Sequence, residues 1–276
     1  MVRFGGDGNP PPRKTAETLD ASGRQGSTRS KNFKKYTNMK RAIIIGATSG
    51  IGKGLAKTLV NDNYKVGITG RRTKLLDELK SENPENYYAQ TLDVADTEKT
   101  TEAIEKLVEE LGGLDLLVIC SGTGEINKTL DFEIEKRIID VNVTGFTSIA
   151  DWTFNFFEKQ KYGHLVVISS IAGLRGEWGA PSYNATKAYQ MNYTEALRKK
   201  AKKIKAQIFV TDIRPGFVDT DMAKGEGLFW VASVDKAVLQ IYNAIKKRKQ
   251  VTYITKRWSF VAMLLKRIPN FIYDKM

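Results

Sequence analysis

The chain has 276 residues, of which 41% are hydrophobic, and this is enough for one large α/β domain with its own core. A single cysteine and a single histidine exclude a disulfide framework and a structural zinc site, and no apolar run approaches the ~20 residues that span a bilayer. The formal net charge of +13 is confined to the two ends, because residues 39–245 are neutral, so it does not indicate nucleic-acid binding.

Residues 1–38 are rich in Gly, Pro, Ser, Thr and basic side chains and carry a charge of +5. This composition cannot bury enough apolar surface to fold alone, so it predicts a disordered extension. Met39, just before the first apolar run, offers an alternative start of the protein. A targeting peptide is a further alternative, against which Asp7, Glu17 and Asp20 count.

From residue 41 onward, short apolar runs alternate with helical patterns such as Thr97–Leu111 and Ser182–Lys203. Continuous apolar runs indicate strands that are covered on both faces, and strands that alternate with helices indicate a parallel sheet. The predicted strands are Ala42–Ile45, Val66–Thr69, Tyr88–Leu92, Leu114–Ile119, Leu165–Ile168, Gln207–Asp212 and Val251–Ile254. The pattern predicts a Rossmann-type, doubly wound parallel sheet in a single α/β domain over residues 39–255.

A glycine-rich turn follows the first predicted strand, with Gly46, Gly50 and Gly52 around Ser49 and Ile51. Glycines allow a tight turn and a close approach of the backbone to a ligand. The helix that follows presents N–H groups and its positive dipole end at the turn. Strand, glycine turn and helix in this order predict a pyrophosphate site, and the alternative is a turn without a ligand.

Two arginines, Arg71 and Arg72, follow the second predicted strand, where NAD-binding sheets carry an acidic residue for the ribose 2′-hydroxyl. The planar guanidinium group suits a 2′-phosphate instead. The sequence therefore predicts NADP(H) as the cofactor, with Arg71 as the first contact and Arg72 as the second. The alternative is that both arginines are the solvated start of a helix.

Tyr183 and Lys187 lie four residues apart in a predicted helix, so their side chains share one face. A nearby cation favours the phenolate and lowers the pKa of a tyrosine from its usual value of about 10, which makes the phenol a usable acid or base. Ser170 lies thirteen residues upstream of Tyr183. Ser169 competes with Ser170 for a role beside the tyrosine, and the spacing favours Ser170.

These motifs, in this order, resemble those of the short-chain dehydrogenase/reductase family over about residues 40–255. The residues that match the family's motifs are Gly46, Gly50, Gly52, Asn142, Ser170, Tyr183, Lys187, Pro215, Gly216 and Thr220. The resemblance implies further cofactor contacts from Ser49, Ile51, Asp93, Val94 and Val218, with Asp93 near the adenine. Ile45 and the stretch Ile119-Cys120-Ser121-Gly122 depart from the family, because polar side chains are usual there.

The resemblance implies an NADP(H)-dependent oxidoreductase that interconverts a carbonyl and an alcohol. Tyr183 is then expected to give a proton to the carbonyl oxygen, and Ser170 to hydrogen-bond that oxygen. Lys187 is expected to lower the pKa of Tyr183 and to hold the nicotinamide ribose, and Asn142 to hold a water that replaces the proton. The alternative is an NADP-binding sensor or scaffold without turnover, which has no need of these side chains.

Other residues are expected to shape the substrate site. His164 is expected at the surface and Cys120 as a small buried thiol, neither of them catalytic. Residues Met222–Val231 match the family's flexible lid, in which Leu228, Phe229 and Trp230 are candidates to cover an apolar substrate or to pack in the core. Trp178 is a candidate wall of the same pocket.

Residues 256–276 are basic and aromatic, and residues 246–276 together carry a charge of +8. This composition fits an interfacial helix on an anionic membrane, and the alternatives are a helix packed on the body or across a dimer interface. The expected partners are a small-molecule carbonyl or alcohol and further copies of the chain, as a dimer or tetramer, with no nucleic acid. The expected location is the cytoplasm, with peripheral membrane contact as the alternative.

Overall fold

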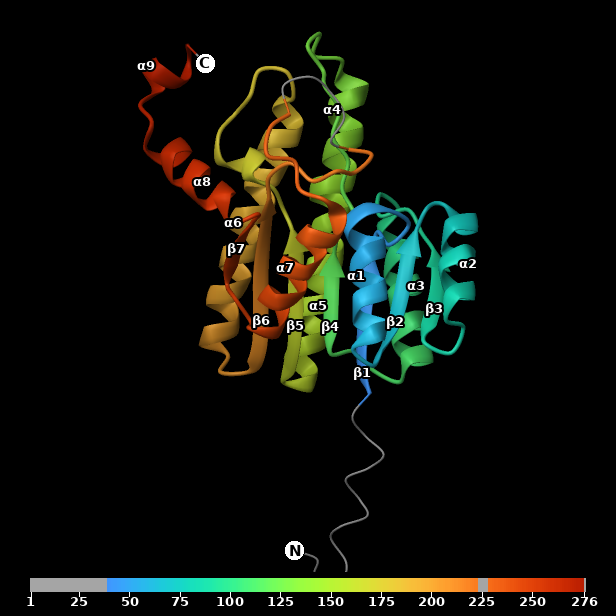
Figure 1. Cartoon of the computed structure of the whole chain (residues 1–276). Coiled ribbons are helices and arrows are strands. Elements are labelled where there is room, and N and C mark those ends of the chain that lie inside the picture. Colours follow the sequence, from blue (N-terminus) through green and yellow to red (C-terminus); the bar gives the residue numbers. More distant parts are fainter. Residues whose placement is uncertain (1–38, 223–227, 276) are drawn as a thin grey trace, which may run out of the picture. The chain divides into compact units, whose positions relative to one another are not determined.

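The protein, analysed as a computed structural model, is described over residues 39–222 and 228–275, so the extension predicted for residues 1–38 lies outside the described residues. Seven parallel strands form one sheet in the order β3-β2-β1-β4-β5-β6-β7 (Figure 1). Their bounds are β1 Lys40–Ile45, β2 Tyr64–Gly70, β3 Tyr87–Thr91, β4 Leu116–Ile119, β5 Tyr162–Ile168, β6 Gln207–Pro215 and β7 Val251–Ile254. The predicted Rossmann-type, doubly wound fold is confirmed.

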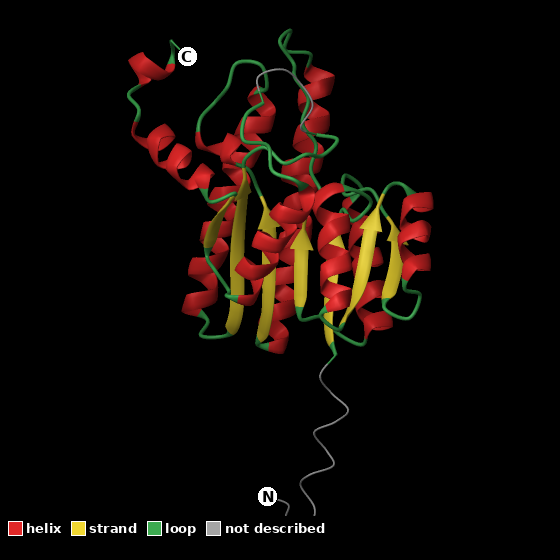
Figure 2. Ribbon diagram, in the orientation of Figure 1, coloured by secondary structure: helices red, strands yellow, loops and turns green. Residues whose placement is uncertain are grey.

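Helices cover both faces of the sheet, as Figure 2 shows. On one face lie α1 (Gly50–Asn61), α2 (Thr73–Glu82) and α7 (Val234–Lys246), and on the other lie α3 (Thr97–Leu111), α5 (Phe146–Gln160) and α6 (Pro181–Lys203). Because successive side chains of a strand point to opposite faces, Ala42 and Ile44 of β1 enter the first core and Ile43 and Ile45 enter the second. All four are fully buried, which explains why this strand is apolar throughout.

The order of the strands reverses at β1, which pairs with β2 on one side and with β4 on the other. In open parallel sheets this reversal leaves a crevice at the carboxyl ends of the strands, where ligands bind. The segments that follow β1, β2, β3, β4, β5 and β6 therefore meet at one end of the sheet, the upper end in Figure 1. All predicted site motifs belong to these segments or to the helices that follow them.

Beyond β7 the chain forms α8 (Arg257–Arg267) and the short α9 (Asn270–Tyr273). Trp258 and Ala262 of α8 are buried, and the Trp258 ring lies so close to Gly216 that a Cβ there would be 2.1 Å from it. One face of α8 therefore packs on the body of the protein. Within residues 39–222 and 228–275, none of the helices has the length and apolar character needed to cross a membrane.

Candidate active site

A cleft of about 990 Å³ lies at the carboxyl end of the sheet. Of the residues predicted for the site, those that line it are Gly46, Ser49, Gly50, Ile51, Arg71, Arg72, Asp93, Val94, Ser170, Tyr183, Lys187, Pro215, Gly216, Val218 and Thr220. Gly52 and Asn142 lie behind the lining. The fold thus brings motifs from six segments of the chain to one cavity.

The glycine turn requires its glycines for steric reasons. Gly46 has a φ of +92°, and a Cβ at this position would lie 2.8 Å from the backbone nitrogen of Ser121. A Cβ on Gly52 would overlap the carbonyl oxygen of Gly46 at 1.9 Å. The turn is therefore packed against the segment after β4, and α1 begins at Gly50 with its N-terminus at the cleft.

The departure at Ile45 is accompanied by a hydroxyl from the neighbouring strand. Ile45 itself is fully buried in the core. Thr69 of β2 is also buried, and its Oγ1 donates to the carbonyl of Ile44 at 3.2 Å and accepts from the N–H of Gly46 at 3.3 Å. A threonine on β2 thus supplies a polar side chain at the floor of the glycine turn.

Arg71 and Arg72 both line the cleft but have different partners. Arg72 donates from Nη2 to the hydroxyls of Thr48 and Ser49, each at 2.7 Å, and so is tied to the glycine turn. Arg71 is largely exposed, with its Nη1 3.9 Å from Asp93. Two guanidinium groups thus stand at the end of β2, one held by the turn and one paired weakly across the cleft.

Ser170 and Tyr183 meet in the cleft through their hydroxyl groups. Burial raises the pKa of Tyr183, and the hydrogen bond to Ser170 lowers it by a smaller amount. Gly124 packs against the tyrosine ring so closely that a Cβ there would lie 2.6 Å from Cδ2. The phenol is therefore enclosed and aimed at the serine.

Lys187 is buried beside this pair. Burial lowers its pKa to about 8, although Cys120 and Asp212 act in the opposite direction. Its Nζ donates to Oε1 of Gln190 at 3.0 Å and to the carbonyl of Ile168 at 3.3 Å, and it lies 5.8 Å from the centre of the Tyr183 ring.

The expectation that Lys187 lowers the pKa of Tyr183 stays a prediction, because burial sets the net direction of both shifts in this structure. Both side chains lose water, so the pKa of Tyr183 rises and that of Lys187 falls.

Asn142 lies in a π-helical segment, Asp140–Gly145, between α4 (Phe132–Ile139) and α5. Its side chain accepts from the N–H of Thr123 at 2.9 Å and donates to Thr186 at 3.1 Å, while its carbonyl accepts from Gln190 at 2.8 Å. Gln190 therefore links Asn142 to Lys187. Sequence reasoning missed Gln190, although its place one turn after Lys187 on the same helix was a usable signal.

The remaining candidate residues are Ser169, His164 and Cys120. Ser169 is buried and donates to Asp212 at 2.5 Å, so its hydroxyl points away from Tyr183. The expectation that His164 lies at the surface is wrong. The residue is buried within β5 beside Thr211, and burial lowers its pKa to about 4. Cys120 lines the cleft, and burial raises its pKa to about 12, so its thiol is not a nucleophile.

The lining of the cleft also includes the apolar side chains of Phe217, Met222 and Leu228. Residues 223–227 of the predicted lid lie outside the described residues, whereas Phe229 and Trp230 are half-exposed and contact Trp258.

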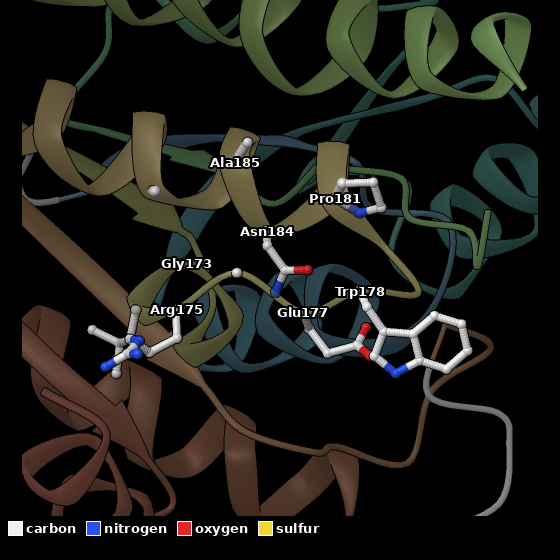
Figure 3. Close-up of a pocket in the computed structure, with 10 residues that line it drawn as sticks. Gly173, Arg175, Glu177, Trp178, Pro181, Asn184 and Ala185 are labelled. Atoms are coloured by element: carbon white, nitrogen blue, oxygen red, sulfur yellow. The ribbon is translucent and has the colours of Figure 1, made fainter. Parts of the chain in front are cut away.

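Trp178 is exposed and lines an adjoining pocket of about 490 Å³, shown in Figure 3. Arg175 borders both cavities, and it was not predicted.

Comparisons with known proteins identify the family to which the chain belongs. A family model described as short chain dehydrogenase matches residues 40–228. An uncharacterized oxidoreductase of Myxococcus xanthus is 32% identical over 245 residues, which cover 85% of this chain and 95% of that protein. An uncharacterized oxidoreductase of Staphylococcus saprophyticus is 33% identical over 190 residues, which cover 67% of this chain and 80% of that protein.

Two solved structures share the fold. ElxO with NADP bound has a TM-score of 0.70 and 25% identity, and the match covers 79% of this chain and 97% of that one. A short-chain dehydrogenase from Streptomyces avermitilis has a TM-score of 0.73 at 22% identity over 86% of this chain and 94% of that one, which supports the fold alone. Because the family model spans more than half of the chain and includes the glycine turn, Ser170, Tyr183 and Lys187, this protein is a member of the short-chain dehydrogenase family of oxidoreductases.

Proposed function

We propose that the protein is an NADP(H)-dependent oxidoreductase that interconverts a carbonyl and an alcohol, with Tyr183 as the acid and base. The observation that carries the proposal is that Ser170, Tyr183 and Lys187 line the same cleft as the glycine turn, with the Lys187 Nζ 5.8 Å from the centre of the Tyr183 ring. The similar solved structure of ElxO has NADP bound, which supports this cofactor. A coenzyme held at the turn and a substrate held by Ser170 would meet in this cleft.

The turn fits a dinucleotide. Gly46 and Gly50 have positive φ values and bring the backbone to the cleft without side chains, and the N-terminus of α1 can neutralise a pyrophosphate. NADPH, when bound, supplies the hydride. The protein's own part is to orient the substrate oxygen through Ser170 and to exchange a proton at the Tyr183 oxygen. Lys187, with a pKa of about 8, stays largely protonated at neutral pH, so its charge favours proton loss from the tyrosine.

Replacing Tyr183→Phe tests the acid and base role. The change removes the exchangeable proton, so turnover of a carbonyl substrate should fall by about 10²- to 10⁴-fold while NADPH affinity stays within about twofold. Tyr189→Phe on the same helix is the matched control, because the Tyr189 hydroxyl bonds to Thr147 outside the cleft. Full activity in Tyr183→Phe would refute the assignment. If a broad panel of ketones and alcohols shows no turnover while NADPH binds, the result would favour the alternative of an NADP-binding sensor or scaffold.

The preference for NADP(H) rests on Arg71 and Arg72 at the end of β2. Calorimetry should show weaker binding of NADPH by about 10- to 100-fold in Arg71→Ala, with little change for NADH, because a charge-assisted hydrogen bond contributes about 1.5–3 kcal/mol. Arg72→Ala should weaken both coenzymes, since Arg72 also holds Thr48 and Ser49. Lys74→Ala, an exposed change nearby, is the control. Equal affinity of the native protein for NADPH and NADH would contradict the proposal.

Three further expectations stay predictions: a cytoplasmic location, assembly into a dimer or tetramer, and the division of the chain into residues 1–38, 39–255 and 256–276. The single cysteine supports a reducing compartment. Analytical ultracentrifugation measures the assembly. Limited proteolysis measures the boundaries, and cleavage within residues 1–38 and close to the boundary at residue 256 is the expected pattern.

A further inference from the structure

The two C-terminal helices leave five large apolar side chains exposed to solvent. Phe260, Met263 and Leu264 of α8 are 57%, 40% and 50% exposed, and Phe271 and Ile272 of α9 are 68% and 43% exposed. We call these five side chains the terminal apolar face. Large exposed apolar patches rimmed by polar residues mark sites of protein or membrane interaction.

The opposite side of the same segment is fastened to the body of the protein. Trp258 packs against Gly216 and Phe217, with the Trp258 and Phe217 ring centres 5.4 Å apart. Arg175 donates to the carbonyl of Ile268 at 3.1 Å and stacks on the ring of Tyr273 at 4.1 Å. The terminal apolar face is therefore presented in a fixed orientation.

The fastened side also forms a wall of the active-site cleft. Leu265 and Tyr273 line the cleft, and their neighbours Leu264 and Ile272 belong to the terminal apolar face. Arg175 lies five residues after Ser170 and borders both the cleft and the pocket in Figure 3. The segment formed by α8 and α9 therefore lies between the cleft and the molecule that binds the terminal apolar face.

The charge around the terminal apolar face indicates what kind of surface binds there. Residues 256–275 contain five exposed basic side chains (Lys256, Arg257, Lys266, Arg267 and Lys275) and a single acid, Asp274. In a twofold symmetric dimer the same patch meets itself, so two such faces would repel. An anionic bilayer surface complements the charge, and it accepts apolar side chains below the headgroups. With 11 residues, α8 is too short to span a bilayer, so it would lie in the interface.

We propose that α8 and α9 dock the protein on anionic membranes and place the cleft at the bilayer, so that the substrate is an apolar carbonyl or alcohol dissolved in the membrane. The substrate class rests on the proposed function, whereas the docking does not. The apolar side chains of Phe217, Met222 and Leu228 in the lining of the cleft fit such a molecule.

Co-sedimentation of the full chain with vesicles tests the docking without any substrate. Vesicles of phosphatidylcholine with about one third phosphatidylglycerol should bind the protein, and pure phosphatidylcholine should bind it far less. Phe260→Asp/Leu264→Asp should lower the partition coefficient by about 100-fold through lost apolar burial. Lys266→Glu/Arg267→Glu should lower it by at least about 25-fold, because each basic residue contributes about a factor of five.

Matched control variants make the same kinds of substitution at exposed positions outside α8 and α9. Leu239→Asp changes an exposed leucine of α7, and Lys202→Glu/Lys203→Glu reverses two exposed charges at the end of α6, so neither should alter binding. Thermal unfolding and NADPH affinity verify that each variant is folded. Absent binding to anionic vesicles, or binding that the α8 variants leave unchanged, would overturn the docking. So would a shift from dimer to monomer in Phe260→Asp/Leu264→Asp, since that result assigns the face to a second copy.

NADPH oxidation separates the two parts of the proposal. A long-chain ketone dissolved in anionic vesicles should be reduced at least about tenfold more efficiently by the native protein than by Phe260→Asp/Leu264→Asp, while a short water-soluble ketone should be reduced equally by both. Equal efficiencies on the long-chain ketone would overturn the substrate class and leave the docking intact. Lack of turnover with every carbonyl would count against the proposed function, and the vesicle measurements would still decide the docking.

Discussion

Replacing Lys187→Met should stabilise the free protein at neutral pH even though it removes a residue of the candidate active site. Burial lowers the pKa of Lys187 from 10.5 to about 8, and a difference of that size corresponds to ~3 kcal/mol of destabilisation while the lysine is charged. Methionine fills a similar volume without a charge. It also leaves Gln190 Oε1 and the Ile168 carbonyl without their donor, which costs about 1–3 kcal/mol. The expected net gain near pH 7 is about 1 kcal/mol, or ~2–4 °C in Tm.

The dependence on pH is the sharper part of this prediction. Because the pKa of Lys187 is lower in the folded than in the unfolded state, the unfolded state binds more protons between pH 8 and 10.5. The stability of the native protein relative to the variant therefore rises with pH across that window. Near pH 10 most of the cost of the charge is gone and only the lost hydrogen bonds remain, so the variant should be the less stable protein by about 1 kcal/mol.

Urea unfolding of both proteins near pH 7 and near pH 10, followed by circular dichroism, measures the difference. Lys202→Met is the control, because Lys202 is exposed on the same helix and its replacement should change stability by less than ~0.5 kcal/mol at either pH. A Lys187→Met variant that is less stable by the same amount at both pH values would show that Lys187 is not a cation held at a cost, and the reasoning would fail.

Two further changes probe the supports of the site. Gln190→Leu removes the acceptor of the Lys187 ammonium, so the pKa of Lys187 should fall by a further ~1–2 units. NADPH affinity measured against pH should then decline at a correspondingly lower pH than in the native protein. Gln190→Glu should instead shift the decline to higher pH. Coincident pH profiles in all three proteins would exclude a role of Gln190 in setting the pKa of Lys187. Gly46→Ala combines a φ of +92° with a clash at Ser121, so it should cost about 3 kcal/mol of stability and abolish NADPH binding. Gly112→Ala, with a φ of +73° and open space among the described residues, should cost only ~1–2 kcal/mol, and equal losses at both positions would rule out the clash.

The fold was predictable because strands that are buried on both faces are apolar throughout, and this pattern is visible in the sequence. The apolar run at Ala42–Ile45 lies within β1, and α3 spans the predicted range Thr97–Leu111. The ends of strands were less predictable. β6 continues to Pro215, three residues beyond the predicted end, since Gly216 donates its N–H to Ile254 of β7 and keeps the two strands together. Partners of that kind come from distant parts of the chain.

The positions of the site residues were also predictable, because their spacing along strands and helices carries them to the same edge of the sheet. The electrostatics were not. The sequence shows a cation next to a tyrosine, but the extent of burial sets the direction of the pKa shift for both Tyr183 and Lys187. Gln190 escaped notice for a related reason, since a glutamine on a helix is usually solvated and only its enclosure between Lys187 and Asn142 makes its hydrogen bonds count.

The Tyr183 and Lys187 pair, the glycine turn and the alternating apolar runs are local patterns, and for this reason the amino-acid sequence alone is sufficient to specify the family, the sheet and the chemistry that the cleft is expected to perform. The surroundings of those groups depend on contacts between segments far apart in the chain. Packing turns Ser169 toward Asp212 and leaves Ser170 facing Tyr183. Packing also buries one side of α8 beside the cleft and exposes the other, a division that composition does not reveal because both sides are apolar.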